Sequence, residues 1–116
     1  MNPRKIFVAL AIGIVAAASH SQPSEMVGAG TASCKDYLSF TQEADKLVLL
    51  SWTQGFMSGL NLARSNLPPD SGTREIPDSD VLQALVAAHC RKNVKDLLGT
   101  ASTKVFFSLP PAKKSR

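Results

Sequence analysis

The sequence is poor in the side chains that most often perform catalysis or bind metal ions. It contains two histidines, His20 and His89, and two cysteines. A glycine-rich phosphate loop and a G-x-S-x-G nucleophile turn are both absent, and no two carboxylates stand at helical spacing among apolar residues, as acid–base catalysis would require. His89 beside Cys90 offers neither a metal cluster nor a Cys-His nucleophile pair. We therefore expect a protein that is not an enzyme and that uses no metal and no cofactor.

A strong excess of charge of one sign is also missing. The formal net charge of +4 includes Arg4 and Lys5; without these two, the chain has eleven basic and nine acidic residues, a net charge of +2. This balance gives no reason to expect a nucleic-acid partner. Acidic residues concentrate between residues 70 and 80, and basic residues between 91 and 116. A solvated face with a solubilising tail explains this distribution, and a polar surface for a partner is the alternative.

No hydrophobic run is long enough for a stable membrane anchor. Residues 6–18 are uncharged, but a helix that spans a bilayer needs about 20 apolar residues. The run follows a basic start and ends in the small residues Ala16-Ala17-Ala18-Ser19, an order typical of a cleaved export signal. We predict a signal peptide over residues 1–18, cleaved after residue 18 or after residue 21, and a periplasmic or secreted protein.

The two cysteines, Cys34 and Cys90, are then expected to form a disulfide bond. Cysteines pair outside the cytoplasm, whereas two unpaired buried cysteines would suit a cytosolic protein. After signal cleavage the chain has about 100 residues, near the size at which one core gives only a small margin of stability. A bond between such distant residues restricts the unfolded chain and is worth roughly 4 kcal/mol in the chain-entropy model.

The hydrophobic spacing predicts an all-α fold, a small compact four-helix domain over residues 33–109. Residues 19–32 are rich in glycine, proline and small side chains and are predicted to be a flexible lead-in. Ser33 and Asp36 have the spacing of a helix N-cap with an acid three residues later, and a short helix follows. Residues 41–45 fit either a turn or a further solvated helical segment.

Three longer helices are predicted next. The strongest runs from about Ala44 to Ser65, and helical spacing groups its apolar side chains into one stripe. That stripe consists of Val48, Trp52, Phe56, Leu60 and Ala63, and Leu49, Met57 and Leu62 widen it. A third helix follows its cap, Asp78, and a last helix begins at Asn93 and is stopped by Pro110 and Pro111. The basic tail, residues 110–116, is predicted to be disordered.

Gly55 and Gly59 stand four residues apart inside the strongest helix. A glycine in a helix interior costs about 1 kcal/mol relative to alanine, so the pair requires a reason. We predict close packing of this helix, through Trp52, Gly55, Phe56 and Gly59, against another helix or a loop backbone. Contact with a ligand or a partner is the alternative, and Trp52 is expected to be mainly in the core.

Several motifs resemble two families of small exported proteins. They are Thr31-Ala32-Ser33-Cys34, Ser51-Trp52-Thr53-Gln54-Gly55-Phe56-Met57-Ser58-Gly59-Leu60-Asn61 and Ala88-His89-Cys90-Arg91-Lys92-Asn93. The W-x-x-G-F/Y-x-x-G run is similar to the Rap/Tai-type periplasmic immunity proteins of type VI secretion, although His89 stands where those often have tyrosine and Val94 where they often have proline. The opening Cys34-x-x-Tyr37-Leu38 is similar to the HdeA-type acid-stress chaperones, which usually lack the tryptophan and the second glycine.

The resemblance covers about Ser33 to Val105 and implies, for both families, a signal peptide, a compact helical fold and one disulfide. The first family implies an immunity protein that occludes the active site of a secreted toxin. The second implies a chaperone, dimeric at neutral pH, that exposes apolar surface to unfolded clients in acid. A housekeeping envelope protein is a third alternative. The expected partner is another protein, a toxin or an unfolded client, and a homodimer is also considered.

The predicted contact with that partner is the segment from Asn66 to Asp80. Residues 66–77 contain three prolines and a glycine, which exclude a regular helix. Loops of about twelve residues are often binding loops, and this one is acidic and flanked by helices. The predicted contact residues are Asp70, Arg74, Glu75 and Asp80.

Overall fold

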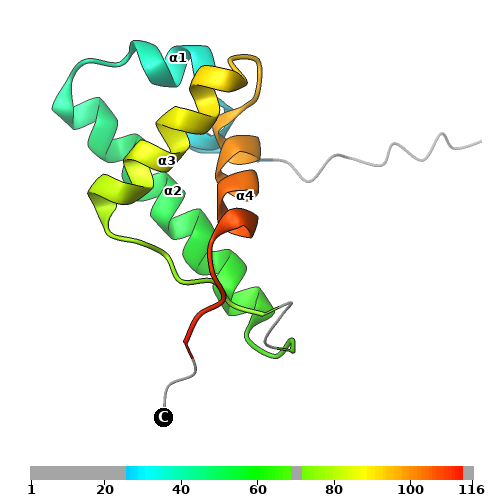
Figure 1. The fold of residues 1–116 in the computed structure, drawn as a ribbon. Helices are drawn as coiled ribbons and strands as arrows, with labels where there is room; N and C mark the ends of the chain where they lie inside the picture. The colour runs from blue at the N-terminus through cyan, green and yellow to red at the C-terminus, as the bar shows by residue number, and fades with distance from the viewer. Residues whose placement is uncertain (1–25, 69–71, 114–116) are drawn as a thin grey trace, which may run out of the picture.

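The computed structural model describes residues 26–68 and 72–113, which form an all-α domain (Figure 1). A short 3-10 helix, η1 (Gly28–Thr31), precedes four α-helices, and no strand occurs in the described ranges. The α-helices are α1 (Cys34–Ser39), α2 (Glu43–Arg64), α3 (Ser79–Lys92) and α4 (Leu98–Ser108). The predicted signal peptide, both cleavage positions and the adjoining residues 19–25 lie outside the described residues.

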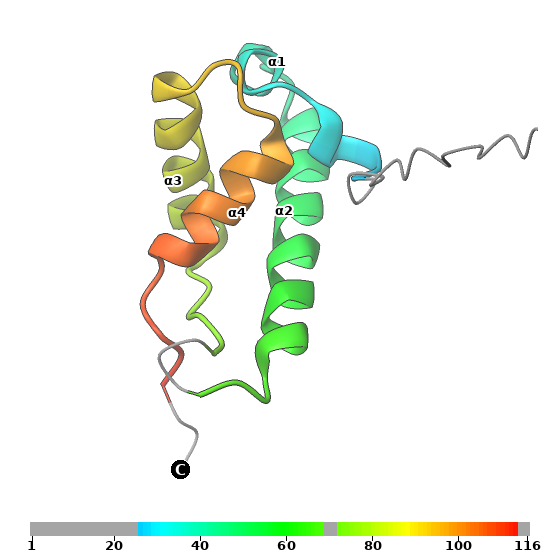
Figure 2. The same cartoon turned by 90° about the vertical axis from the view of Figure 1, so that its right-hand side faces the viewer.

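Helix α4 lies at the centre of the domain and contacts η1, α1, α2 and α3 (Figure 2). Its inward residues are fully buried: Leu98, Ala101, Ser102 and Phe106. The side chains that complete the core come from α2 and α3: Leu49, Leu50, Met57, Leu82 and Val86. One core therefore holds the three long helices together, and the predicted all-α, four-helix fold class is confirmed.

A disulfide bond between Cys34 and Cys90 pins the first residue of α1 to the last turn of α3, as predicted. The Cα atoms of the two cysteines are 4.9 Å apart, and both residues are fully buried. Ser33 caps α1, because its Oγ accepts a hydrogen bond from the backbone N–H of Asp36 at 3.0 Å. Residues 41 and 42 form the turn to α2, which settles the alternative left open by the sequence.

The last helix begins later than predicted. The prediction that Asn93 caps it is wrong: α4 begins at Leu98, and Asn93 instead ends α3, where its side-chain amide donates to the carbonyl of His89 at 3.0 Å. Residues 94–97 are not helical, because two of their carbonyl oxygens accept hydrogen bonds from the first two backbone amides of α1, at 2.7 and 3.1 Å. Those amides have no partner inside their own helix, so tertiary pairing outweighs the local helical pattern.

The face of α2 that packs on the core is centred at one edge of the predicted stripe. Its buried residues are Leu49, Leu50, Thr53 and Met57, whereas Val48 is 62% exposed. The Thr53 hydroxyl donates to the carbonyl of Leu49 at 2.9 Å, so this polar residue is satisfied inside the core. The prediction is therefore right for one edge of the stripe, where Leu49 and Met57 are buried, and wrong for Val48 and Leu62, which face outward.

The predicted flexible lead-in is partly folded, which corrects the N-terminal boundary of the domain. η1 packs against α2 and α4, and Gly28 begins it with a φ of +73°, a conformation that favours glycine. Gly30 lies so close to Trp52 that an added Cβ would overlap the indole ring. Trp52 is half-buried and borders the core, where it holds η1 in place. The domain therefore includes η1, which was predicted to belong to the lead-in.

The C-terminal boundary also moves outward. Residues 110–112, predicted to be part of a disordered tail, run antiparallel to residues 73–75 of the α2–α3 loop. The amide of Glu75 donates to the carbonyl of Pro110 at 2.9 Å, and the amide of Ala112 donates to the carbonyl of Thr73 at 2.9 Å. These two hydrogen bonds make the segment after α4 a structural part of the domain.

Candidate functional site

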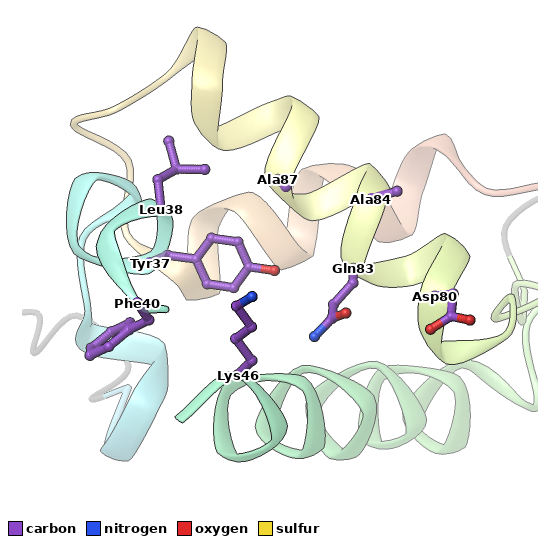
Figure 3. A pocket seen from close by; sticks show the side chains of 8 residues that line it. All are labelled: Tyr37, Leu38, Phe40, Lys46, Asp80, Gln83, Ala84 and Ala87. Atoms are coloured by element: carbon purple, nitrogen blue, oxygen red, sulfur yellow. The ribbon is translucent and has the colours of Figure 1, made fainter. Parts of the chain in front are cut away.

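A cleft opens where α2 and α3 diverge, and α1 closes its wide end (Figure 3). At the narrow end the side-chain amide of Gln54 on α2 donates to the hydroxyl of Ser79 on α3 at 3.0 Å. The cleft has a volume of about 410 Å³, within the range of ligand sites in proteins. We call it the α1–α3 cleft. Its lining residues are Tyr37, Leu38, Phe40, Lys46, Asp80, Gln83, Ala84 and Ala87.

Apolar side chains make up most of the cleft wall. Ala84 and Ala87 on α3 are small and leave the space open, while Leu38 and Phe40 from the α1 side remain 37% and 36% exposed. A helix of six residues cannot bury so many large apolar groups within the domain. The side chains of Leu38 and Phe40 border the cleft, so apolar surface at its edge remains accessible to a partner.

Polar groups meet in the cleft from three helices. The Tyr37 hydroxyl, the Lys46 ammonium and the Gln83 amide point into the same space (Figure 3). Burial raises the pKa of Tyr37, so its hydroxyl stays protonated and can donate. Asp80 lies toward the other end. The cleft thus places hydrogen-bond donors at one end and a carboxylate at the other.

The structure distributes the predicted contact residues over different places. Asp80 is exposed in the first turn of α3 and lines the α1–α3 cleft. Glu75 is exposed on the loop, and Asp70 lies outside the described residues. Asp78 stands at the N-cap position of α3, as predicted, although its side chain makes no capping hydrogen bond.

Arg74 is half-buried and anchors the loop, while its predicted role as a contact residue stays a prediction. Its guanidinium donates to the carbonyl of Leu109 at 3.2 Å. The side chain of Asn61 on α2 holds its backbone on both sides: the Arg74 N–H donates to Asn61 Oδ1 at 2.7 Å, and Asn61 Nδ2 donates to the Arg74 carbonyl at 2.9 Å. The part of the loop that carries Glu75 is therefore rigidly held.

The prediction that Gly55 and Gly59 allow close packing inside the domain is wrong. Both glycines are exposed, and an added Cβ on either would meet no other atom within 4 Å beyond the helix itself. The same prediction is confirmed for Trp52, which packs against Gly30 of η1, whereas the ring of Phe56 stacks on Trp52 of the same helix with centroids 5.0 Å apart. The two glycines therefore lie on a face of α2 that packs against nothing in the described part of the chain.

His89 belongs to a small ionic cluster beside the disulfide. Its Nε2 lies 2.8 Å from Asp96 Oδ2, and Lys104 Nζ lies 3.1 Å from the same oxygen. The hydrogen bond to His89, and then that to Lys104, holds the pKa of Asp96 below its ordinary value. Asp96 thereby ties α3, the loop after it and α4 together. Within the described ranges, no group of three or more His, Cys, Asp or Glu residues is placed to hold a metal ion.

Residues 26–68 and 72–113 contain no helix long and apolar enough to cross a membrane. Comparison of the chain with models of known families, with curated proteins and with solved structures finds no match. The residues of the α1–α3 cleft were not predicted, apart from Asp80. The sequence signal that could have indicated them is the excess of large apolar side chains in the short helix after Ser33.

Proposed function

We propose that this protein is an exported, non-catalytic binding protein of the immunity type, which inhibits a secreted toxin by covering its active site. The observation that carries the proposal is the α1–α3 cleft. An accessible apolar wall lies between Lys46 at one end and Asp80 at the other, the pattern of apolar centre and polar rim that is typical of protein interfaces.

The rigidity of the site supports binding. The Cys34–Cys90 disulfide fixes α1 relative to α3 at the wide end of the cleft, and the Gln54–Ser79 hydrogen bond fixes α2 relative to α3 at the narrow end. The loop that presents Glu75 is held by Asn61 and by residues 110–112. A surface that is already ordered loses little entropy on binding, and its exposed acids can steer a basic partner.

Two features support export. Disulfides persist in oxidising compartments such as the periplasm, and the structure holds one. The N-terminal sequence has the order of a signal peptide. We therefore assign the protein to the periplasm or the extracellular space as part of the proposal.

The test uses a cleft-filling variant and a matched control on the same helix. The immunity role requires a secreted toxin encoded beside the gene for this chain, and the product of such a neighbouring gene is the partner to assay. The intact protein should inhibit that toxin. Ala84→Arg should raise the Kd for the toxin at least tenfold, because the arginine side chain fills the cleft. Ala88 is exposed on α3 and lies outside the cleft lining, so Ala88→Arg should leave the Kd unchanged. Full inhibition by Ala84→Arg would place the contact elsewhere, and the lack of any toxin inhibition would refute the immunity role.

An acid-stress chaperone of the HdeA type is a second candidate, because the ion pairs of Asp96 beside the core depend on its carboxylate being charged. Its carboxylate ties α3 to α4 through His89 and Lys104, and protonation in acid weakens both contacts next to the core. Such a chaperone would suppress the aggregation of unrelated clients at about pH 2–3 without any dedicated partner. Measuring client aggregation on the same preparation separates the two functions, since an immunity protein does not protect unrelated clients.

A further inference from the structure

The outward face of α2 carries no charged residue along its length. At about 100° of rotation per residue, the helix residues within about 40° of Gly55 share one face, and all of them are exposed. They are Ala44, Val48, Ser51, Gly59 and Leu62. Val48 is 62% exposed and Leu62 is 78% exposed, whereas the solvent side of a surface helix is normally polar. We call this set the α2 outer face.

The α2 outer face is self-complementary about Gly55. Val48 and Leu62 stand seven residues before and after Gly55, and Ser51 and Gly59 stand four residues before and after it. If two such helices run antiparallel with Gly55 on a two-fold axis, Val48 of each copy faces Leu62 of the other, and Ser51 faces Gly59. The small central residues let the two backbones approach closely, and the large apolar residues fill the space on either side.

We propose that two copies of this chain associate through the α2 outer face as an antiparallel, two-fold symmetric helix pair. Helices α3 and α4 lie on the same side of α2 (Figure 2), and nothing approaches Gly55 or Gly59 from the outside within 4 Å in the described part of the chain. Lys46, which lines the α1–α3 cleft, lies about 180° around the helix from Gly55. The dimer therefore leaves the cleft open, and the inference does not depend on toxin binding.

Charge at the helix ends favours the antiparallel arrangement. The first turn of α2 carries Glu43 and Asp45, and its last turn carries Arg64. A parallel pair would place the acids of one copy beside the same acids of the other. An antiparallel pair keeps these acids apart and places the two helix dipoles head to tail. Arg64 takes no part in the contact, because it lies on the opposite side of α2, where its Nε donates to the carbonyl of Gly72 at 3.1 Å.

The size of the face indicates a weak dimer. A helix of 22 residues is about 33 Å long and about 10–12 Å wide with its side chains, so two such faces bury on the order of 800 Å² in total. Burial of the flanking Leu47, which is 57% exposed, would add to this area and bring the total closer to the roughly 1,000 Å² at which specific interfaces begin. We expect a dissociation constant on the order of tens of micromolar.

Sedimentation equilibrium over about 5–500 μM protein tests the association. The intact protein should change from monomer to dimer over this range, and both Leu62→Glu and Gly55→Arg should raise the dissociation constant at least tenfold. Gly55→Arg enters open space, so the monomer should keep its helical circular dichroism. Ala88→Arg on α3 is the control and should dimerise like the original chain. The proposal is overturned if the protein is a monomer at every concentration, or if its dimer is unaffected by both substitutions. It is also overturned if the protein is a monomer and Leu62→Glu abolishes only its binding to another protein.

Oxidative cross-linking tests the geometry. In the antiparallel pair, the Gly55→Cys variant should cross-link to itself. Ser51→Cys and Gly59→Cys should each remain uncross-linked alone and should cross-link when mixed. Efficient cross-linking of Ser51→Cys to itself would indicate a parallel pair and would contradict the two-fold axis at Gly55.

Discussion

At the scale of single residues, Asp96 concentrates several structural tasks on one carboxylate. Its Oδ2 is hydrogen-bonded to the side chains of His89 and Lys104, and its backbone carbonyl accepts a hydrogen bond from the amide of Cys34 at 2.7 Å. A carboxylate with a lowered pKa stabilises the folded state above its ordinary pKa of about 4, and this contribution is lost as the pH falls through the lowered value. Asp96 therefore makes part of the stability of the domain sensitive to acid.

We predict that Asp96→Asn lowers the melting temperature more at pH 6 than at pH 3, because the ionised form is what His89 and Lys104 stabilise. The melting temperature of the variant should consequently depend less on pH between about 5 and 2. Thermal unfolding followed by circular dichroism measures this, with the exposed Glu75→Gln as the control. Equal losses of stability at pH 6 and pH 3 would show that the cluster does not contribute through charge.

Two glycines of similar type should respond in opposite ways to the same substitution. Gly30→Ala places a methyl group against the Trp52 indole, and such overpacking typically costs about 1–3 kcal/mol. Gly55→Ala meets no neighbour and should raise the free energy of unfolding of the monomer by about 0.5–1 kcal/mol, because alanine favours the helix. Urea unfolding at low protein concentration compares the two variants, and a destabilised Gly55→Ala would show that its face is covered within the monomer.

At the scale of elements, α1 depends on what holds it. A helix of six residues is too short to be stable alone, and α1 is fixed by the Cys34–Cys90 bond and by the backbone of residues 94–97. We predict that replacing both cysteines with serine costs about 2–5 kcal/mol and frees α1 first. Hydrogen exchange should show α1 losing protection before α4; equal protection in both helices would contradict this order.

The C-terminal segment should divide into a part that supports the α2–α3 loop and a part that does not. Removing residues 110–116 deletes two backbone hydrogen bonds to Thr73 and Glu75, each worth about 0.5–1.5 kcal/mol. We predict a loss of about 1–3 kcal/mol and faster proteolysis of the loop for this truncation. Removing only residues 114–116 is the control and should change neither, and equal proteolysis rates for the two truncations would argue against the pairing.

At the scale of the whole molecule, the acids predicted as the contact should set the rate at which a basic partner associates. We predict that the variant with Asp70→Asn, Glu75→Gln and Asp80→Asn associates more slowly and shows a flatter dependence on salt, because steering is screened by ions. Stopped-flow kinetics from about 20 to 500 mM salt measures both. The variant with Asp36→Asn and Asp45→Asn is the control for the loss of charge outside the predicted contact. If the triple variant changes only the dissociation rate and leaves the association rate unaltered, electrostatic steering by these acids is contradicted.

The sequence by itself determined the helical class, the disulfide and most helix positions. Helical spacing predicted α2 to within one residue at each end, and Ser33 was identified as a cap because a cap is a local hydrogen bond. Trp52 was expected to pack against another segment of the chain, and it packs against η1. The helix positions and the cap depend on residues that are neighbours along the chain. The disulfide could be predicted because the chain has two cysteines and therefore one possible pairing.

Only the tertiary structure decided which face of α2 enters the core, where α4 begins and where the cleft lies. The face of α2 was ambiguous because Val48 and Leu62 are as apolar as Leu49 and Met57, and only the position of α4 distinguishes them. The start of α4 depends on amides of α1 that lie about sixty residues earlier in the chain. Contacts between segments so distant in sequence leave no local pattern, and for this reason the cleft and the α2 outer face became visible only when the helices were assembled.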